Sequence, residues 1–433
     1  MITQKEYQKR RTDLMKRLPA QSIMIIPSGE EVLRSGDVHY PFRQQSDFLY
    51  LTGFSEPHSI LVLKDGKSWL FNAPQDDQKT VWTGPVLGQM GAIAQLGMDE
   101  AYPVGDFEVY LHTLLEGVTA IYYPFLQGGQ WEKKLFSTWK QVRSQRRQDR
   151  ALPSAFHDVS PWIASMRLFK SPDEIRTIQK VVDISVDAHI AVMQQISSCE
   201  YEYQAAAIFH QHLQQQGIME VAYPSIVASG ENACILHYTE YHRAFQSTDL
   251  LLIDAGGEYK GYAADLTRTY PVRGRWTFEQ QAIYELVLAA QKAAIAVIKP
   301  QIQWSEIQKT ILSFLTQGLK DLGILQGTLS GLLEQQAYKS FYMHGSGHWL
   351  GMDVHDVGAY EEHGQSIRLQ SSMVLTVEPG LYFSPQLSHI DERWRGIGVR
   401  IEDDVLVTEQ GNHVFSHRLP KEVDDLQSIG CLC

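Results

Sequence analysis

The chain has 433 residues, more than the ~250 to 300 at which a single hydrophobic core usually stops growing, so we expect two domains. With 44% hydrophobic and 20% charged residues it can bury large cores, and this composition excludes an intrinsically disordered chain. The 38 Lys and Arg residues against 50 Asp and Glu give a net charge of −12, which argues against a nucleic-acid partner because phosphate binding requires clustered positive charge.

No segment has the composition of a signal peptide or a membrane span. Residues 1–18 carry charges throughout, and no run reaches the ~18 apolar residues that a membrane helix needs. The four cysteines do not form a disulfide framework, so we predict a cytoplasmic protein. We interpret Cys431 and Cys433 as part of a frayed terminus rather than a metal site, and the basic cluster within 140–150 as a solvated helix face.

The first part of the chain, residues 1–166, is predicted to form an α/β domain. Strand-like runs separated by Gly, Pro and Asp turns occur at 22–26, 60–63, 69–71 and 120–123. The pattern breaks between 153 and 170. A new helix is then predicted, because Ser171 is a suitable N-cap, Pro172 suits the first helical position and Glu174 completes a capping box. We therefore place a boundary near Arg167 and a second domain at 167–433.

The second domain is predicted to contain helices, including one at 277–298, and a hairpin that carries two acids. An apolar run, 250–254, ends at Asp254, and a second run, 263–272, carries Asp265 beyond a Gly-rich turn. A hairpin can bring the two carboxylates together, where they repel each other unless a metal ion lies between them. Taken alone, the pair is equally compatible with capping or turn roles.

Three histidines among glycines strengthen the metal interpretation. His344, His348 and His355 lie within the Gly-rich segment 341–356. A single histidine would more often be a satisfied core residue, whereas three among glycines indicate a site that a ligand approaches closely. Downstream, Glu378 ends an apolar run at a Pro-Gly turn.

A last acid follows in the segment 396–404. Arg400 and Glu402 alternate there with apolar residues, so both are predicted to point to one face of a strand. The inventory is then two Asp, two Glu and one His, a donor set that suits Mn²⁺, Co²⁺ or Zn²⁺. Two such ions ~3.5 to 4 Å apart, bridged by carboxylates and a water whose pKa they lower, perform hydrolysis.

The ordered acids and histidine resemble the metal ligands of the pita-bread metallopeptidases, a group that includes methionine aminopeptidase, prolidase and aminopeptidase P. The matching residues are Asp254, Asp265, His348, Glu378 and Glu402. Within the group the chain most resembles aminopeptidase P, through the segments 40–54, 237–240 and 253–256. The resemblance extends from about residue 3 to about 415. It implies a creatinase/aminopeptidase P-type α/β N-terminal domain followed by an α+β pita-bread catalytic domain.

This resemblance also implies a role for each metal ligand and two divalent ions, which we expect to be Mn²⁺. Asp254 is expected to chelate one ion, and Asp265 and Glu402 to bridge both. His348 and Glu378 are expected to complete the other ion, with Glu378 acting also as the proton shuttle.

Further residues are expected on the substrate side of the site. His237, His344 and His355 match positions that hold the scissile carbonyl or its oxyanion. Arg400 and Tyr382 match positions beside the metal ligands or the substrate. Trp82 resembles a tryptophan that the family's oligomers present to a neighbouring active site, although a lone tryptophan more often serves plain packing.

The implied activity is release of the N-terminal residue from peptides with proline in the second position. A proline amide has no N–H, so peptidases that grip that group fail on it. An Xaa-Pro dipeptidase, or prolidase, is the alternative, because Gly347 stands where aminopeptidases P often carry Ser or Thr. A non-enzymatic binding module and a metal-free hydrolase of the creatinase kind are disfavoured, because all five ligands are present.

Overall fold

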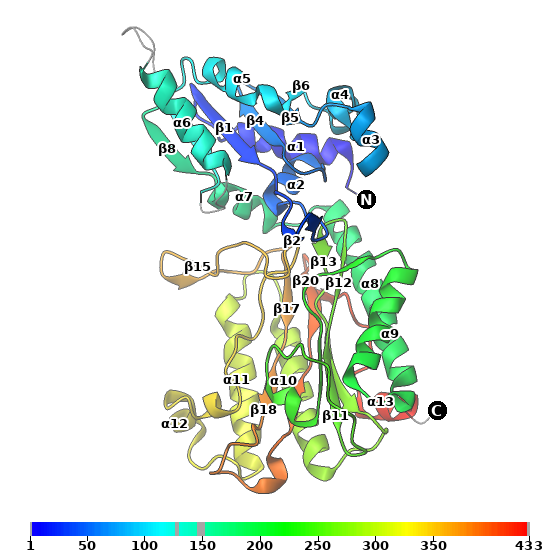
Figure 1. The fold of residues 1–433 in the computed structure, drawn as a ribbon. Coiled ribbons are helices and arrows are strands. Elements are labelled where there is room, and N and C mark those ends of the chain that lie inside the picture. The colour runs from blue at the N-terminus through cyan, green and yellow to red at the C-terminus, as the bar shows by residue number, and fades with distance from the viewer. Residues whose placement is uncertain (1, 126–129, 145–151, 431–433) are drawn as a thin grey trace. The chain divides into compact units, whose positions relative to one another are not determined.

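The computed structural model describes residues 2–125, 130–144 and 152–430, and it divides into two compact units, 1–166 and 167–433 (Figure 1). Each unit is described by itself. The C-terminal cysteine pair Cys431 and Cys433 lies outside the described residues, as does the part of the basic cluster beyond Ser144. Within the described ranges, no helix is long and apolar enough to cross a membrane.

The N-terminal unit is built on a mixed six-stranded sheet with the strand order β6-β5-β4-β1-β7-β8. β1 pairs antiparallel with β4 and parallel with β7. The four strand-like runs predicted from the sequence are all confirmed. The strands are β1 (Ser22–Pro27), β4 (Ile60–Lys64), β5 (Lys67–Asn72), β6 (Glu100–Pro103), β7 (Ala120–Tyr123) and β8 (Ala155–Asp158).

Helices α5 and α6 pack on this sheet, where Leu111 and Leu135 join a buried cluster with Ile23, Val62 and Phe71. A short hairpin of β2 (Leu33–Ser35) and β3 (Val38–His39) is exposed. The helices of the unit are α1 (Gln4–Met15), α2 (Ser46–Thr52), α3 (Asp77–Thr83), α4 (Gly88–Leu96), α5 (Phe107–Leu114), α6 (Gln130–Ser144) and α7 (Ser160–Arg167).

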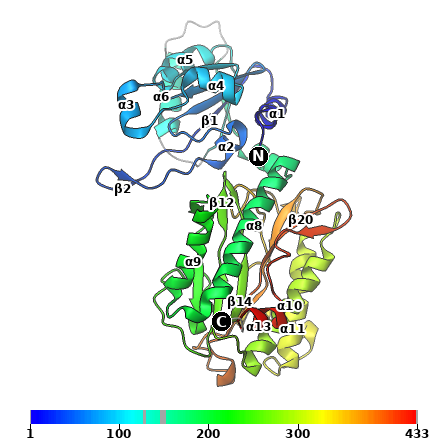
Figure 2. The same ribbon diagram turned by 90° about the vertical axis from the view of Figure 1, so that its right-hand side faces the viewer.

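The second unit places its strands between two pairs of long helices. In the two views, α8 and α9 lie on one side of the central strands and α10 and α11 on the other (Figures 1 and 2). α8 begins as predicted, since the Ser171 hydroxyl and the Glu174 carboxylate form a capping box. The helices are α8 (Pro172–Gln195), α9 (Glu202–Gln215), α10 (Phe278–Val297), α11 (Trp304–Asp321), α12 (Leu329–Glu334) and α13 (Val423–Gly430).

The strands of this unit form several small antiparallel sheets. The predicted hairpin is present as β11 and β14, with Asp254 opposite Thr267. Its three-stranded sheet contains β10 (Ile226–Ser229), β11 (Leu250–Asp254) and β14 (Thr267–Pro271). The other strands are β9 (Glu220–Val221), β12 (Gly257–Tyr259), β13 (Tyr262–Ala263), β15 (Glu361–Glu362), β16 (Gln365–Ser366), β17 (Val374–Val377), β18 (Gly380–Tyr382), β19 (Gly398–Arg400), β20 (Asp403–Val407) and β21 (Asn412–Val414).

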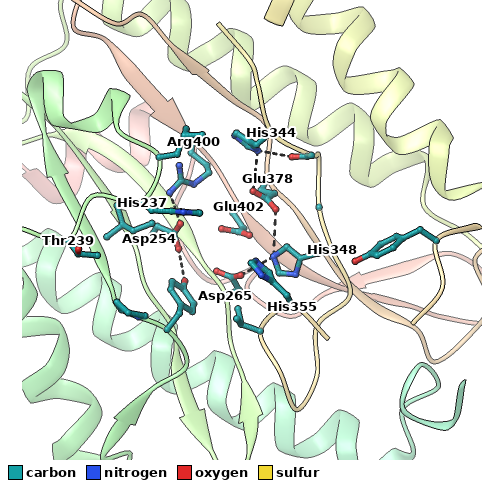
Figure 3. Close-up of a pocket in the computed structure, with 18 residues that line it drawn as sticks. His237, Thr239, Asp254, Asp265, His344, His348, His355, Glu378, Arg400 and Glu402 are labelled. Carbon is teal, nitrogen blue, oxygen red and sulfur yellow. Dashed lines mark hydrogen bonds and ion pairs between the residues drawn. The ribbon is translucent and has the colours of Figure 1, made fainter. Parts of the chain in front are cut away.

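One detail of the predicted hairpin is wrong. Asp265 does not lie in a strand but in the link between β13 and β14. The backbone of Ala264 there approaches Gly256 so closely that a Cβ on this glycine would lie 1.8 Å from the Ala264 carbonyl oxygen. This close approach interrupts the apolar run and turns the Asp265 side chain into the site described below (Figure 3).

Candidate active site

A pocket of about 660 Å³ in the second unit collects most of the residues singled out from the sequence (Figure 3). Tyr382 is not among the residues that line it, and Trp82 belongs to the N-terminal unit, where its side chain on α3 is 87% exposed. The predicted site residues in the lining are His237, Asp254, Asp265, His344, His348, His355, Glu378, Arg400 and Glu402.

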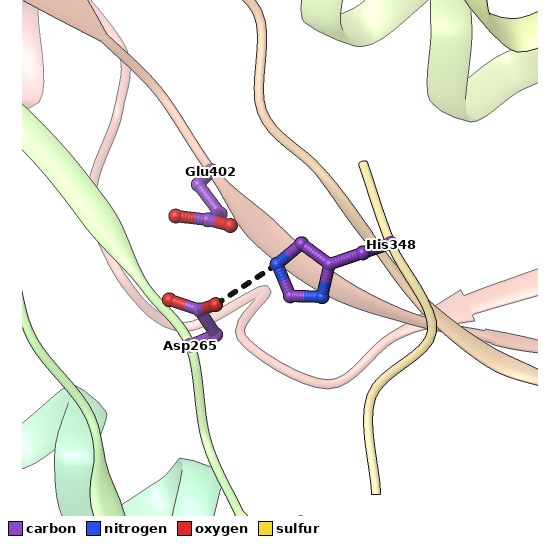
Figure 4. Close-up of side chains that lie close together, drawn as sticks. All are labelled: Asp265, His348 and Glu402. Carbon is purple, nitrogen blue, oxygen red and sulfur yellow. Dashed lines mark ion pairs between the residues drawn. The ribbon is translucent and has the colours of Figure 1, made fainter. Parts of the chain in front are cut away.

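Three of the predicted metal ligands form a compact donor group. One ligand atom each from Asp265, His348 and Glu402 lies within 4.8 Å of the others (Figure 4). Nε2 of His348 is 3.2 Å from Asp265 Oδ2 and 3.6 Å from Glu378 Oε1. Nδ1 of His348 donates to the Trp349 carbonyl at 3.0 Å, so Nε2 is the nitrogen that faces the carboxylates. An imidazole held in this orientation can bind a metal ion through Nε2 once that nitrogen loses its proton.

The acids reach this point from the ends of separate strands. Asp254 ends β11, and Glu378 directly follows β17. Glu402 is held against β14 by a backbone bridge to Thr267, whose hydroxyl donates to Glu402 Oε2 at 2.7 Å. Strand ends thus deliver Asp254, Glu378 and Glu402 to one shared pocket, and the link before β14 delivers Asp265.

Burial and mutual repulsion disfavour the ionised forms of these acids. Asp265 and Glu402 are 5% and 2% exposed. Burial, reinforced by neighbouring carboxylates, raises the pKa of both, and it raises the pKa of Glu378 to about 7. Burial opposes the charged form of His348, but the contact with Asp265 outweighs it and raises the pKa to about 9. The raised pKa values mean that these groups hold protons when no metal ion is bound. A divalent cation would take the place of those protons, so the donor set fits a metal ion.

Arg400 and Tyr382 hold other site residues in place. Arg400 is 4% exposed and donates to Asp254 Oδ2 at 2.5 Å, to the Tyr382 hydroxyl at 2.9 Å and to Thr267 Oγ1 at 3.3 Å. The Tyr382 hydroxyl in turn lies 2.8 Å from Nε2 of His344, whose Nδ1 donates to the Gly345 carbonyl. The guanidinium is therefore engaged within the protein.

Two of the remaining histidines, His344 and His355, have lowered pKa values. Burial, with a contribution from Arg400, lowers the pKa of His344 to about 4. Burial and the neighbouring His348 lower the pKa of His355, whose ring centroid lies 4.4 Å from that of His348. His237 is exposed at the pocket wall. A neutral imidazole N–H can donate to a carbonyl oxygen without adding a positive charge beside a metal ion.

Comparison with known proteins identifies the group to which this arrangement belongs. Residues 176–409 match the model of metallopeptidase family M24, and residues 7–122 match that of the aminopeptidase P N-terminal domain. The chain belongs to family M24 and, within it, to the aminopeptidases P. The predicted fold class, an aminopeptidase P-type α/β domain followed by a pita-bread catalytic domain, is confirmed.

Similar proteins match over almost their full length. The Xaa-Pro aminopeptidase of Escherichia coli is 39% identical over 433 residues, covering 99% of this chain and 98% of the relative. Human Xaa-Pro aminopeptidase 3 is 34% identical, and the match covers 99% of this chain and 86% of the relative. The solved structure of Pseudomonas aeruginosa aminopeptidase PepP superposes with a TM-score of 0.97 at 41% identity, covering 100% of this chain and 98% of that one. These matches do not favour the prolidase alternative.

The structure also accounts for Gly347, the residue that kept prolidase in view. A Cβ at this position would lie 2.1 Å from the Thr376 carbonyl oxygen. The two backbones are paired here, since Thr376 donates to the His348 carbonyl and Glu378 to that of Ser346. The glycine is thus required by a close backbone approach beside the metal ligands, whatever substrate the site accepts.

Sequence reasoning missed two residues that orient the aspartates. The Tyr223 hydroxyl donates to Asp254 Oδ1 at 2.6 Å, and Asp404 Oδ2 accepts from the Asp265 amide at 3.1 Å. These partners are 31 and 139 residues apart along the chain. No local motif connects residues at such separations, although Asp404 lies only two residues after the predicted ligand Glu402.

Proposed function

We propose that the chain is an aminopeptidase that releases the N-terminal residue from peptides whose second residue is proline. The observation that carries this proposal is the full-length match to Xaa-Pro aminopeptidases together with a pocket that presents every acid and histidine of the family's pattern. The net charge of −12 suits a peptide substrate better than a nucleic acid.

We assign two divalent ions, Mn²⁺ in our proposal, to the acidic end of the pocket. Asp254 would hold one ion, Asp265 and Glu402 would bridge both, and His348 and Glu378 would complete the other. The spacing of the Asp265, His348 and Glu402 donor atoms, within 4.8 Å of one another, supports this assignment. When bound, such ions lower the pKa of a coordinated water and polarise a carbonyl oxygen.

The side chains of the pocket would supply orientation and proton transfer. His237 and His355 would donate to the scissile carbonyl and to the oxyanion that develops from it. His344, whose Nδ1 donates to the Gly345 carbonyl and whose Nε2 lies at the Tyr382 hydroxyl, would line the substrate pocket beside them. Glu378, whose pKa is raised to about 7 by burial, would accept a proton from the attacking water and return it to the departing proline nitrogen. The hydroxyl adds to the carbonyl carbon and the π electrons move to the carbonyl oxygen. When the carbonyl re-forms, the bond to the proline nitrogen breaks and this nitrogen takes the proton from Glu378.

The apolar part of the lining would accommodate the proline ring. Ile226, Leu236, Val354 and Tyr360 all border the pocket. Proline offers no N–H to recognise, so contact with its ring has to replace that hydrogen bond.

Peptide length tests the proposal against the dipeptidase alternative. A prolidase must bind the free carboxylate of proline, and losing such a contact costs about 1.5 to 3 kcal/mol. Arg400, the one arginine in the lining, is already paired with Asp254 and Tyr382. We therefore expect Ala-Pro-Ala to be cleaved at least as well as Ala-Pro, measured as kcat/KM with and without Mn²⁺. A preference of about 10-fold or more for the dipeptide would identify a dipeptidase.

We further propose a cytoplasmic homo-oligomer, a dimer or tetramer, in which Trp82 reaches the active site of a neighbouring copy. The 87% exposure of Trp82 on α3 supports this role, because a side chain as large and apolar as tryptophan is seldom left so exposed to water. Light scattering should give a mass at least twice the 49.2 kDa of one chain. A fully active monomer would contradict the proposal.

A further inference from the structure

Glu202, the first residue of α9, is a buried carboxylate with an unusual number of hydrogen-bond donors around it. It is 0% exposed. Its Oε1 accepts from the Ser229 amide at 2.7 Å, from the Ser229 hydroxyl at 2.8 Å and from Asn232 Nδ2 at 3.1 Å. Its Oε2 accepts from the Tyr238 hydroxyl at 2.9 Å and from the Arg243 amide at 3.2 Å. All five donors belong to the segment 229–243.

This segment, which we call the His237 segment, forms one wall of the active-site pocket. Leu236, His237 and Thr239 line the pocket, and Figure 3 shows His237 and Thr239 on that wall. Among the described residues, the His237 ring has no hydrogen-bond partner that could fix it. Its neighbour Tyr238 is 9% exposed and is tied to Glu202. The position of His237 therefore depends on how the backbone around it is held.

Glu202 ties both arms of the His237 segment to one point. Ser229 and Asn232 precede His237, whereas Tyr238 and Arg243 follow it. Backbone hydrogen bonds reinforce the anchor, because the Glu202 amide donates to the Arg243 carbonyl at 3.2 Å. Without the carboxylate, the five donors would lose the acceptor that they share in this buried place.

We infer that Glu202 is a positioning residue that holds His237 in the geometry needed to bind the peptide. This inference rests on the proposed function for its activity readout. An ionised carboxylate can accept from all five donors, whereas a glutamine would turn its NH₂ group toward two or three of them. Glu202→Gln therefore changes the anchor while it preserves the size of the side chain.

A double-mutant cycle with His237 separates positioning from a general structural role. We expect Glu202→Gln to lower kcat/KM for Ala-Pro-Ala by about 10-fold or more, since small misplacements of binding groups have effects of this size. In a His237→Ala background the same change should lower it by less than about 3-fold, because the group being positioned is already gone. Equal losses in both backgrounds would overturn the inference.

Matched variants keep this test interpretable. Glu231→Gln changes an exposed glutamate of the same segment that does not line the active-site pocket, and it should leave kcat/KM within about 2-fold of the unmodified enzyme. If Glu202→Gln does not fold, Tyr238→Phe can replace it, because it removes one of the five hydrogen bonds. This variant should lower kcat/KM by a smaller factor, and the loss should again depend on the presence of His237. Metal content should be unchanged in every variant, because Glu202 touches none of the proposed metal ligands.

Hydrogen exchange provides a readout that does not depend on activity. Glu202→Gln should speed amide exchange across 230–243 by about 10-fold or more and leave α10 unchanged. If the unmodified enzyme cleaves no Xaa-Pro peptide, the proposed function fails, while faster exchange would still support the anchor. If exchange across 230–243 is unchanged, the inference about Glu202 fails and the proposed function is unaffected.

Discussion

Two groups of buried carboxylates in the second unit differ in how the chain neutralises them. Asp403 is 0% exposed and lies 2.7 Å from Arg268 and 2.6 Å from Lys421. Burial alone would raise its pKa, but these two cations hold the pKa well below its ordinary value. Asp356, which is 5% exposed, pairs with Lys170 at 2.9 Å and also with Arg167. In this group the protein supplies every positive charge that the acids need.

Three acids of the active site, Asp265, Glu378 and Glu402, lack such partners among the described residues, whereas Asp254 pairs with Arg400. In the part of the chain that the structure describes, no Lys or Arg forms an ion pair with Asp265, Glu378 or Glu402, and only imidazoles lie within ion-pair distance. Burial raises the pKa of all three. The contrast teaches that buried acids balanced entirely by protein cations serve the fold, whereas a cluster of buried acids that mostly lacks them marks a site for an external cation.

The largest expected effect comes from removing a bridging carboxylate. Glu402→Ala and Asp265→Ala should reduce hydrolysis of Ala-Pro-Ala to background and lower the metal content, because each removes an anion between two cations. Activity assays with elemental analysis measure both outcomes. Glu361→Ala, an exposed glutamate of β15, is the control and should behave as the unmodified enzyme. Normal metal stoichiometry with near-normal rates in either active-site variant would exclude the dinuclear assignment.

Substitutions among the buried acids that pair with protein cations should change the stability of the fold. Arg268→Met removes a cation that is 0% exposed and leaves Asp403 partly unpaired, so we expect the free energy of unfolding to fall by about 3 to 5 kcal/mol. Urea denaturation measures this change. Arg176→Met breaks an exposed pair with Asp173 and should cost less than about 1 kcal/mol. Similar losses in the two variants would show that burial does not distinguish these pairs.

His355 should affect rate without affecting metal binding. His355→Ala should lower kcat by about 100-fold, the size seen when one donor to an oxyanion is removed, and leave the metal stoichiometry unchanged. The control is His363→Ala, since that side chain is 92% exposed. If His355→Ala lost metal in proportion to its loss of activity, His355 would be a metal ligand and not a donor to the substrate.

Metal removal should make stability depend on pH. Without metal, the folded-state pKa of His348 is raised from 6.5 to about 9, so this group stabilises the fold fully below about pH 6.5 and loses that effect as the pH rises through 9. Glu378, raised from 4.5 to about 7, acts in the same direction at lower pH. The lowered pKa values of His344 and His355 act only below about pH 6.5.

We therefore expect the Tm of the metal-free protein to fall by roughly 5 °C between pH 7 and pH 9. The metal-loaded protein should show a smaller fall, because a bound cation replaces the proton of His348. Metal-free His348→Gln serves as the reference and should have a flatter profile. Equal slopes for this variant and the unmodified metal-free protein would show that His348 does not carry the effect.

Much of the fold could be predicted because it depends on residues close together in sequence. The start of α8 follows from Ser171 and Glu174, three positions apart, and the β11 strand from one uninterrupted apolar run. The identity of the site could be proposed because its five ligands occur in a characteristic order. The position of Asp265 was predicted less well, since the break before β14 arises from the approach of Ala264 to Gly256.

The amino-acid sequence by itself determined where the main helices and strands form and which acids and histidines can supply ligands, because capping and hydrophobic periodicity act over a few residues. Only the tertiary structure decided which of these side chains meet. The contacts of Glu402 with Thr267, of Arg400 with Asp254 and of Glu202 with Tyr238 join residues 135, 146 and 36 positions apart. Such contacts form only when the sheets and helices pack, so no local pattern encodes them.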